Sequence, residues 1–217
     1  MAEPFQQLPR TLWLGVILLL GFIGLAYLLS LVEFKQQHAL PVLGPVADFT
    51  LTNQDGKVTT LADLTNHVWV ADIIFTRCAG PCPIITGHMK SLEDALPKTS
   101  GARLVTLTTD PDFDTPAMMK RYGDRFGADF SRWMFLTGTK AQIGALGGAS
   151  LKLSAVPVQP ADQKSAADLF IHTTIFVIVD KHARLRGLFE TVGDGVDWTN
   201  AVQPRIVAAV RQLEREP

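Results

Sequence analysis

Apolar runs separated by turn-forming residues divide this chain into a series of predicted strands and helices. The segment 68–75 (VWVADIIF) is almost continuously apolar, and 103–109 (RLVTLTT) resembles it, as is typical of strands buried on both faces of a sheet. A stretch with helical periodicity follows each segment, the first ending near Leu96 and the second near Phe126. This order predicts a parallel β-α-β unit.

Other elements flank this unit. Asp55-Gly56 lies between two alternating segments within 49–61 and predicts a β-hairpin. The sequence further predicts a short strand at 133–136, a short helix at 139–146 and a mobile loop at 154–168. A second hairpin at 170–190 and a final amphipathic helix at 199–211 follow. A β-α-β unit followed by a β-β-α unit predicts an α/β, thioredoxin-like fold with an N-terminal β-hairpin.

The most apolar stretch lies near the N-terminus. Residues 12–32 (LWLGVILLLGFIGLAYLLSLV) contain no charged residue over 21 positions, and as a helix they would reach about 31 Å, enough to cross a bilayer core. Trp13 and Tyr27 lie near its two ends, as aromatic residues at membrane interfaces do. A cleaved signal peptide is the less favoured alternative, because no small-x-small cleavage site follows. We therefore expect one transmembrane helix.

This anchor would divide the chain into four parts: a short cytoplasmic tail, the anchor, a linker and one folded domain, at 1–11, 12–32, 33–47 and 48–217. The Lys and Arg counts on the two flanks are equal, so the short tail decides the orientation and puts the domain in the periplasm. No Arg-rich, acid-poor transit peptide is visible, which favours a single-pass protein of the bacterial inner membrane over a mitochondrial one.

Composition excludes several classes of protein. The chain has 217 residues and a formal net charge of -1 without a basic stripe, which argues against nucleic-acid binding. Its hydrophobic fraction of 47% is inflated by the segment 12–32. Two cysteines do not make a disulfide scaffold, and no Cys-x-x-Cys-His sequence exists for haem attachment.

The two cysteines, Cys78 and Cys82, lie four residues apart between the first buried strand and its helix. At a helix start, positions i and i+4 share a face, so the sulfurs can converge. The positive end of the helix dipole is expected to lower a thiolate's pKa there. The pair therefore suits either a soft metal ion or a dithiol–disulfide cycle. The preceding Arg77 would help to stabilise the thiolates or else face solvent.

Three motifs follow one another along the chain: C-x-x-x-C-P at 78–83, D-P-x-x-D-T-P at 110–116, and a histidine at 172 directly before T-T-I-F-V-I-V-D. In this order, behind one N-terminal anchor, they resemble the Sco (SenC) proteins, copper chaperones of cytochrome c oxidase assembly. The resemblance covers about residues 45–212. One departure is Ala79, where the family usually has proline, and we expect it to alter the stiffness of the loop.

The resemblance implies that Cys78, Cys82 and His172 bind one copper ion. Two thiolates and an imidazole suit Cu(I) and tolerate Cu(II), whereas structural zinc would need four ligands. A histidine beside an apolar strand is by pattern alone most often structural, so the position of His172 in the family motif carries this assignment. The other histidines are expected to be structural: His38, His67, His88 and His182. Of these, His88 is expected to lie on the surface.

The segment 110–116 has two interpretations. Thr115 followed by Pro116 fits a helix N-cap with proline at the first helical position. Alternatively, Asp110 and Asp114 form an acidic rim at the cysteine end of the sheet, where either would hydrogen-bond the metal ligands or face a partner. The sequence leaves both interpretations open.

The resemblance implies a membrane-anchored metallochaperone rather than an enzyme. It would receive copper from an upstream donor and deliver it to the dinuclear copper site of cytochrome c oxidase subunit II, and metal binding would order the loop at 154–168. A thiol–disulfide oxidoreductase acting on the client's cysteines is the main alternative, although thioredoxins space their cysteines as Cys-x-x-Cys. A peroxidase of the peroxiredoxin type is a third, less favoured class.

Overall fold

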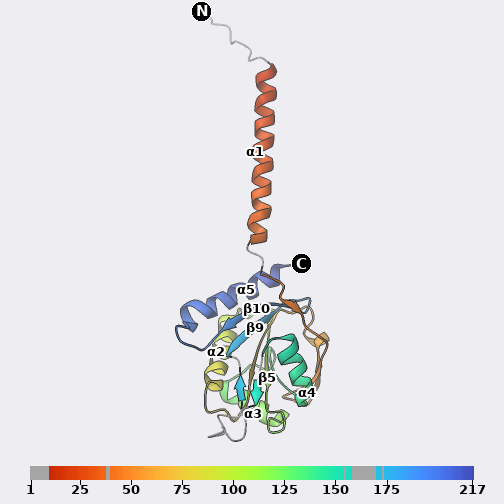
Figure 1. The fold of residues 1–217 in the computed structure, drawn as a ribbon, viewed down its shortest axis with the longest axis vertical. Coiled ribbons are helices and arrows are strands. Elements are labelled where there is room, and N and C mark those ends of the chain that lie inside the picture. The colour runs from red at the N-terminus through yellow and green to blue at the C-terminus, as the bar shows by residue number, and fades with distance from the viewer. Residues whose placement is uncertain (1–9, 38–39, 154, 158–169, 173) are drawn as a thin grey trace, which may run out of the picture. The chain divides into compact units, whose positions relative to one another are not determined.

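The computed structural model describes residues 10–37, 40–153, 155–157, 170–172 and 174–217, in two compact units, Met1–Leu40 and Pro41–Pro217. The first unit contains one helix, α1 (Arg10–Gln37) (Figure 1). It includes the expected anchor and continues into the region predicted to be a linker. Among the described residues, no helix is both long and apolar enough to cross a membrane.

The second unit is built on an eight-stranded sheet with the strand order β1-β10-β9-β4-β5-β6-β2-β3. Its centre consists of three parallel strands and one antiparallel strand: β4 (Trp69–Ile74), β5 (Arg103–Thr108), β6 (Trp133–Thr137) and β9 (Ile175–Val179). The outer strands are β1 (Gly44–Pro45), β2 (Thr50–Asn53), β3 (Val58–Thr60) and β10 (Arg184–Glu190). A separate two-stranded sheet pairs β7 (Ala155–Pro157) with β8 (Phe170–His172).

Helices cover both faces of the large sheet (Figure 1). One face carries the three longer helices of this unit, which are α2 (Cys82–Ala95), α3 (Pro116–Phe126) and α5 (Gln203–Arg215), the last preceded by a π-helix (Trp198–Val202). The other face carries α4 (Lys140–Ile143), which continues as a π-helix (Gly144–Ser150). A short 3₁₀ helix (Leu61–Asp63) follows β3.

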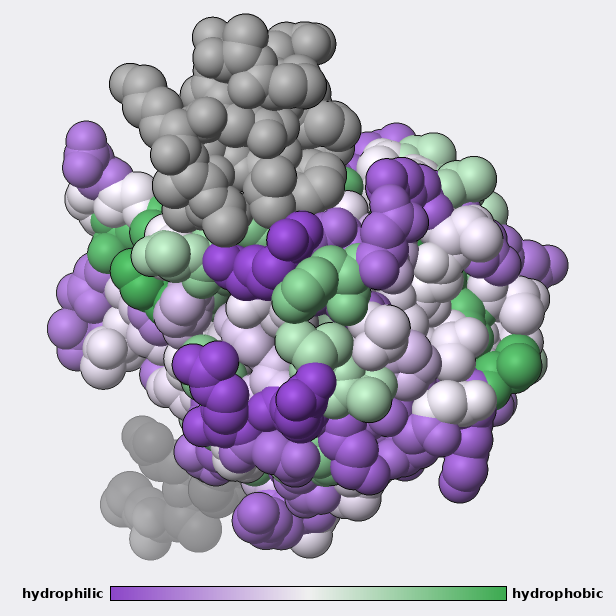
Figure 2. Space-filling view, turned by 90° about the horizontal axis from the view of Figure 1, so that it is seen from below, coloured by the Kyte–Doolittle hydropathy of each residue, from purple (hydrophilic) through white to green (hydrophobic). Residues whose placement is uncertain are grey.

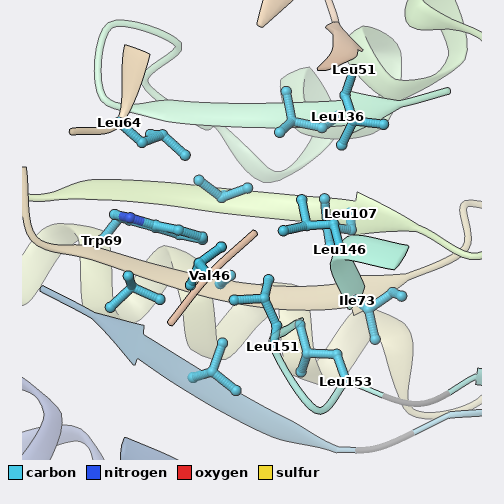
Figure 3. Close-up of a cluster of buried hydrophobic side chains, with 14 of the residues drawn as sticks. Val46, Leu51, Leu64, Trp69, Ile73, Leu107, Leu136, Leu146, Leu151 and Leu153 are labelled. Atoms are coloured by element: carbon cyan, nitrogen blue, oxygen red, sulfur yellow. The ribbon is translucent and has the colours of Figure 1, made fainter. Parts of the chain in front are cut away.

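Alternation along β4 separates the two sides of the sheet. Trp69 and Ile73 lie in an apolar cluster with Leu146 and Leu151 from the α4 side (Figure 3). The intervening Asp72 is fully buried on the opposite face, which α2 covers. Because all six residues of β4 are buried, this strand is a rigid base for the loop that follows it.

The predicted fold class is confirmed by the parallel β-α-β unit and the antiparallel hairpin that follows it. The hairpin at Asp55-Gly56 is also confirmed, with Gly56 at a φ of 74°, which glycine adopts without strain. Two boundaries were wrong. The first strand of the hairpin predicted at 170–190 is two strands, β8 and β9, and residues 155–157 of the predicted loop form β7. Positions 154 and 158–168 of that loop lie outside the described residues.

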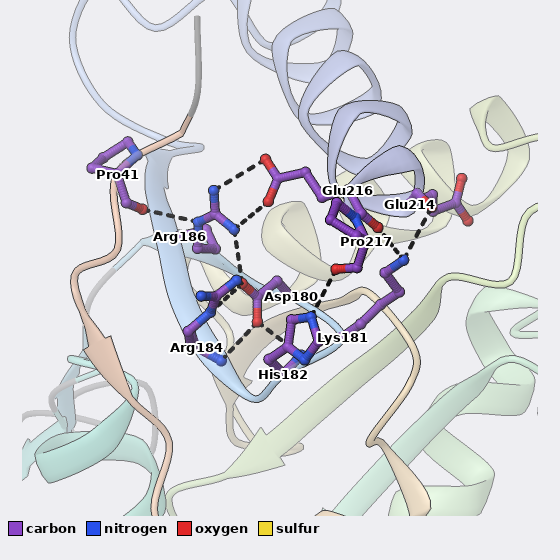
Figure 4. A network of polar contacts seen from close by, with 9 residues as sticks. All are labelled: Pro41, Asp180, Lys181, His182, Arg184, Arg186, Glu214, Glu216 and Pro217. Carbon is purple, nitrogen blue, oxygen red and sulfur yellow. Dashed lines mark hydrogen bonds and ion pairs between the residues drawn. The ribbon is translucent and has the colours of Figure 1, made fainter. Parts of the chain in front are cut away.

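An ion-pair network closes the end of the sheet at which β4 begins (Figure 4). Arg186 Nη1 donates to Asp180 Oδ2 at 2.8 Å and to Glu216 Oε2 at 2.7 Å, and Arg186 Nε donates to the Pro41 carbonyl at 3.1 Å. The side chains of Asp180 and Arg186 are only 2% and 4% exposed. Burial opposes ionisation of Asp180, but hydrogen bonds from Arg186 and Arg184 outweigh it and hold the pKa of Asp180 below its ordinary value.

We expect Arg186→Met to lower the free energy of unfolding by about 3–5 kcal/mol, because it leaves the Asp180 carboxylate buried without its main partner. Urea denaturation of the full chain at pH 7 measures this loss, and Arg211→Met, at an exposed position of α5, is the control. Because the folded-state pKa of Asp180 is depressed, its stabilisation is present above its unfolded pKa, about 3.9, and is lost as the pH falls through the folded value. A loss similar to that of the control would contradict this role.

Candidate functional site

The two cysteines lie where β4 gives way to α2. Cys78 is in the connecting loop, and its backbone N–H donates to the Phe75 carbonyl at 3.2 Å. Cys82 is the first residue of α2, and Pro83 follows it in the first turn, where a missing N–H costs no helical hydrogen bond. The prediction that the motif opens a helix is confirmed. Figure 2 views the molecule from this end, where hydrophilic side chains occupy much of the visible surface.

Both cysteines carry reduced thiols and both are buried, with Cys78 7% and Cys82 0% exposed. The pKa of Cys82 lies far above its ordinary value, because its thiol is hydrogen-bonded to Cys78 and because it is buried. The backbone of Phe75 acts in the opposite direction without reversing this. The expectation that the helix start would lower the pKa is therefore wrong for Cys82. The pair gives up one proton much more readily than two.

A buried hydrogen bond joins the cysteine helix α2 to α3. The Thr86 hydroxyl donates to the Cys82 carbonyl at 2.9 Å and lies 2.9 Å from the Tyr122 hydroxyl of α3. Burial raises the pKa of Tyr122, and the carboxylate of Asp72 raises the pKa values of both Tyr122 and Cys82. The sequence pattern did not mark Asp72 as part of the site, although it is the single charged residue in the apolar segment 68–75.

Asp114 ties the cysteine loop to the end of β5. Its carboxylate is fully buried and accepts hydrogen bonds from the Thr76 N–H at 3.1 Å, from the Thr76 hydroxyl, and from the Thr108 hydroxyl at 2.5 Å. Burial raises the pKa of Asp114, and these hydrogen bonds oppose the rise only in part. Asp114 therefore fixes the backbone two residues before Cys78.

Asp110 holds the next residue of the same loop. Arg77 Nη2 donates to Asp110 Oδ2 at 2.5 Å, and its guanidinium carbon lies 4.1 Å from the centroid of the Phe113 ring. Asp110 is 7% exposed, so the two aspartates form a buried clamp rather than an exposed acidic rim. Arg77, whose side chain is 38% exposed, thus has a carboxylate partner as well as contact with solvent.

The capping interpretation of the same segment is confirmed. The Thr115 hydroxyl accepts a hydrogen bond from the Met118 N–H at 3.4 Å, and Pro116 is the first residue of α3. One segment therefore does two jobs: its threonine and proline start a helix, while its aspartates hold the cysteine loop.

His172 is the last residue of β8, where its backbone pairs with Ala155. Its side chain lies outside the described part of the structure. The following strand β9 runs antiparallel to β4, with Val179 opposite Trp69 and Val177 opposite Ala71. β9 therefore begins at the end of the sheet where β4 finishes. Among the described residues, no group of three or more His, Cys, Asp or Glu side chains could hold a metal ion. The role of His172 as a ligand stays a prediction.

The remaining histidines lie away from the cysteines or pack elsewhere. His67 Nδ1 is 2.8 Å from the Gly101 carbonyl, and His182 Nε2 is 2.8 Å from the Pro217 carbonyl. His88 was wrongly expected on the surface: it is half-buried and stacked on Trp198, with ring centroids 4.3 Å apart. Its partner is the first residue of the π-helix at 198–202 and lies one residue before the predicted start of the final helix. His38 lies outside the described residues.

A thioredoxin-like domain with a buried cysteine pair at the start of its first helix is the class of protein that these features define. The SCO1/SenC family model matches residues 43–206. A SCO1 protein homolog of Bacillus subtilis (strain 168) is 34% identical over 158 residues, or 72% of this chain and 79% of the relative. The chain therefore belongs to the SCO1/SenC family.

Solved structures agree with this assignment. BsSco, described as a member of the Sco family of cytochrome c oxidase assembly proteins with a disulfide switch, has a TM-score of 0.67 at 26% identity, covering 83% of this chain and 100% of BsSco. Copper-bound ScoI of Bradyrhizobium japonicum has a TM-score of 0.63 at 22% identity, covering 78% of this chain and 99% of ScoI. The second likeness concerns the fold alone.

We expect Asp114→Asn to change how stability depends on pH. The folded-state pKa of Asp114 is raised, so the wild-type carboxyl contributes most below its unfolded pKa, about 3.9, and this contribution is lost as the pH rises through the folded value. The stability of the wild type relative to Asp114→Asn should therefore fall as the pH rises. Urea unfolding between pH 4 and 8 measures this slope. The control is Asp112→Asn, at an exposed position. If the stability of the wild type relative to Asp112→Asn changed with pH as steeply as its stability relative to Asp114→Asn, the prediction would be wrong.

Iodoacetamide should modify Cys78 before Cys82 in the reduced, folded chain. The thiolate is the reactive form, and Cys82 is both fully buried and raised in pKa. Peptide mass spectrometry over a time course gives the two rates, and the urea-unfolded chain, where both thiols should react alike, is the control. Equal rates in the folded chain would mean that Cys82 is far more accessible than its burial indicates.

Proposed function

We propose that this protein is a copper metallochaperone that binds one copper ion through Cys78, Cys82 and His172. Its client would be the dinuclear copper site of cytochrome c oxidase subunit II, and a separate donor would supply the copper. The observation that carries the proposal is the pair of reduced, mutually hydrogen-bonded thiols at the loop that Asp110 and Asp114 hold. Membership of the SCO1/SenC family and the likeness to BsSco, a member of the Sco family of cytochrome c oxidase assembly proteins, support it.

The chemistry of the thiols favours copper as cargo. Thiolates are soft ligands that select Cu(I), and an imidazole would complete a three-ligand site that also accepts Cu(II). Binding must displace the Cys82 proton, which its raised pKa otherwise retains, so affinity should rise with pH. A site with only three protein ligands would leave room for an incoming thiolate of the client, which suits transfer.

Strand order supports His172 as the third ligand. β8 is followed within three residues by β9, and β9 begins at the end of the sheet where β4 finishes and the cysteine loop starts. Backbone pairing thereby brings the start of β9, three residues after His172, and the cysteine loop to the same end of the sheet.

We also propose that residues 12–32 attach the domain to the bacterial inner membrane, with the domain in the periplasm. The support is the uncharged sequence together with the exposure of the large apolar side chains between Trp13 and Leu28. A helix that is apolar on all sides requires an apolar environment around it. Attachment there would keep the domain near a membrane-embedded client.

Thiol–disulfide exchange is the second candidate function. The contact between the two sulfurs favours it, because an oxidised client could draw both electrons from one pair of neighbouring thiols. The same cysteines would serve both functions, but His172 would be needed only for copper.

Copper binding to the reduced full chain tests the proposal. We expect one copper per chain, and His172→Ala should weaken Cu(I) binding about 100-fold in chelator competition, because a metal ligand is worth at least as much as the groups that orient it. His172→Ala should also remove or shift the sulfur-to-Cu(II) charge-transfer absorption. His182→Ala, which alters a histidine bonded to the C-terminal residue, is the matched control.

Two outcomes would reject the copper proposal: weak binding in the wild type, or binding that His172→Ala and His182→Ala affect alike. If reduction of a disulfide-containing client peptide then proceeded normally in both variants, thiol–disulfide exchange would be the better description. Loss of exchange together with loss of copper binding in His172→Ala would link the two functions.

A further inference from the structure

An open pocket of about 270 Å³ lies beside the cysteine loop. Its apolar and aromatic walls come from Phe113, Met118 and Tyr122, and its cationic groups are Arg77, Arg121 and Arg125. The copper site proposed above uses none of these side chains. The pocket is therefore a separate feature that needs its own explanation.

Two of the three arginines carry charge that the domain does not neutralise. Arg121 and Arg125 lie four residues apart on α3 and so share one face of the helix. Both are exposed, and within the described part of the chain neither forms an ion pair with a carboxylate. The polar contact recorded for Arg121 is with the Met118 sulfur, at 2.6 Å. Two guanidinium groups are thus available to an incoming anion.

The acidic residues of the preceding loop are already engaged. Asp110 pairs with Arg77, and Asp112 pairs with Lys140 at 2.5 Å. Arg77 also packs over Phe113, which is 37% exposed and leaves part of its ring open to a partner. The pocket consequently combines uncompensated positive charge with an exposed aromatic surface.

The pocket is connected directly to the cysteines. Thr76 and Arg77 line it and immediately precede Cys78. On its other side, Tyr122 contacts the Thr86 hydroxyl, which donates to the carbonyl of Cys82. A group bound in this pocket would therefore lie next to the loop that presents both sulfurs.

We propose that the pocket receives an acidic segment of the client protein, with an aspartate or glutamate side chain between Arg121 and Arg125 and an apolar neighbour against Phe113. Guanidinium groups match the geometry of carboxylates, and complementary charge speeds the encounter of two proteins. A protein segment can use the aromatic wall and the charges together while bringing its own cysteines to Cys78. The identity of this partner as a copper acceptor rests on the proposed function, but the pocket's preference for acidic peptides does not.

Fluorescence anisotropy with the full chain tests this preference. The probe is a labelled 12-residue peptide in which glutamate alternates with leucine, and its glutamine counterpart is the reference. We expect the glutamate peptide to bind more tightly, and Arg121→Gln/Arg125→Gln to weaken it about tenfold, as for two partly exposed charge pairs. Higher ionic strength should reduce the difference.

Arg211→Gln/Arg215→Gln is the matched control, because these arginines have the same spacing on α5 and are also exposed. It should leave peptide binding unchanged. Arg121→Glu/Arg125→Glu should instead bind the corresponding lysine peptide, a reversal that misfolding cannot produce. Copper stoichiometry measured on each variant keeps this test apart from the proposed function, since the pocket variants should still bind one copper if the wild type does.

Three results would overturn the proposal. Equal binding of the glutamate and glutamine peptides would remove the preference for acid. If Arg121→Gln/Arg125→Gln and Arg211→Gln/Arg215→Gln weakened peptide binding equally, the net charge of the domain, and not the pocket, would account for the binding. Binding of glutathione that depends on Arg121 and Arg125, without binding of the peptide, would assign the pocket to a small anionic thiol instead of a protein.

Discussion

The hydrogen bonds to the buried carboxylate of Asp114 are the interaction on which the cysteine site depends. Side chains from the connection between β5 and α3 hold the loop between β4 and α2. Asp114 holds Thr76 and the end of β5, and Asp110 holds Arg77. The burial that raises the pKa of Asp114 is the cost of this arrangement, and its three hydrogen bonds offset that cost in part.

The electrostatics of the cysteine pair follow from the same burial. A thiol at a helix start is usually expected to ionise easily, but Cys82 is enclosed, bonded to Cys78 and close to the Asp72 carboxylate. A site of this kind keeps a proton until a cation replaces it. It thus resists adventitious reaction of Cys82 while still offering two sulfur ligands to a soft metal ion.

The two ends of the sheet have different tasks. At the end where β4 begins, the buried network around Asp180 and Arg186 joins the β9–β10 hairpin to the C-terminus and to Pro41. At the end where β4 finishes lie the cysteine loop, the clamp made by Asp110 and Asp114, and the pocket lined by Arg121 and Arg125. The closed end stabilises the domain, so the open end can present exposed charge and the cysteine loop.

The sequence by itself determined the buried strands, the helix that starts at Cys82, the hairpin at Gly56 and the cap at Thr115, because each depends on local periodicity or on one or two residues. The ordered motifs also determined the family. Only the tertiary structure decided that Asp114 clamps Thr76, that His88 stacks on Trp198, that the pKa of Cys82 is raised, and that Arg77 and Arg121 border one pocket. These features join residues far apart in the chain, and burial and long-range contact leave no periodic signal from which they could be predicted.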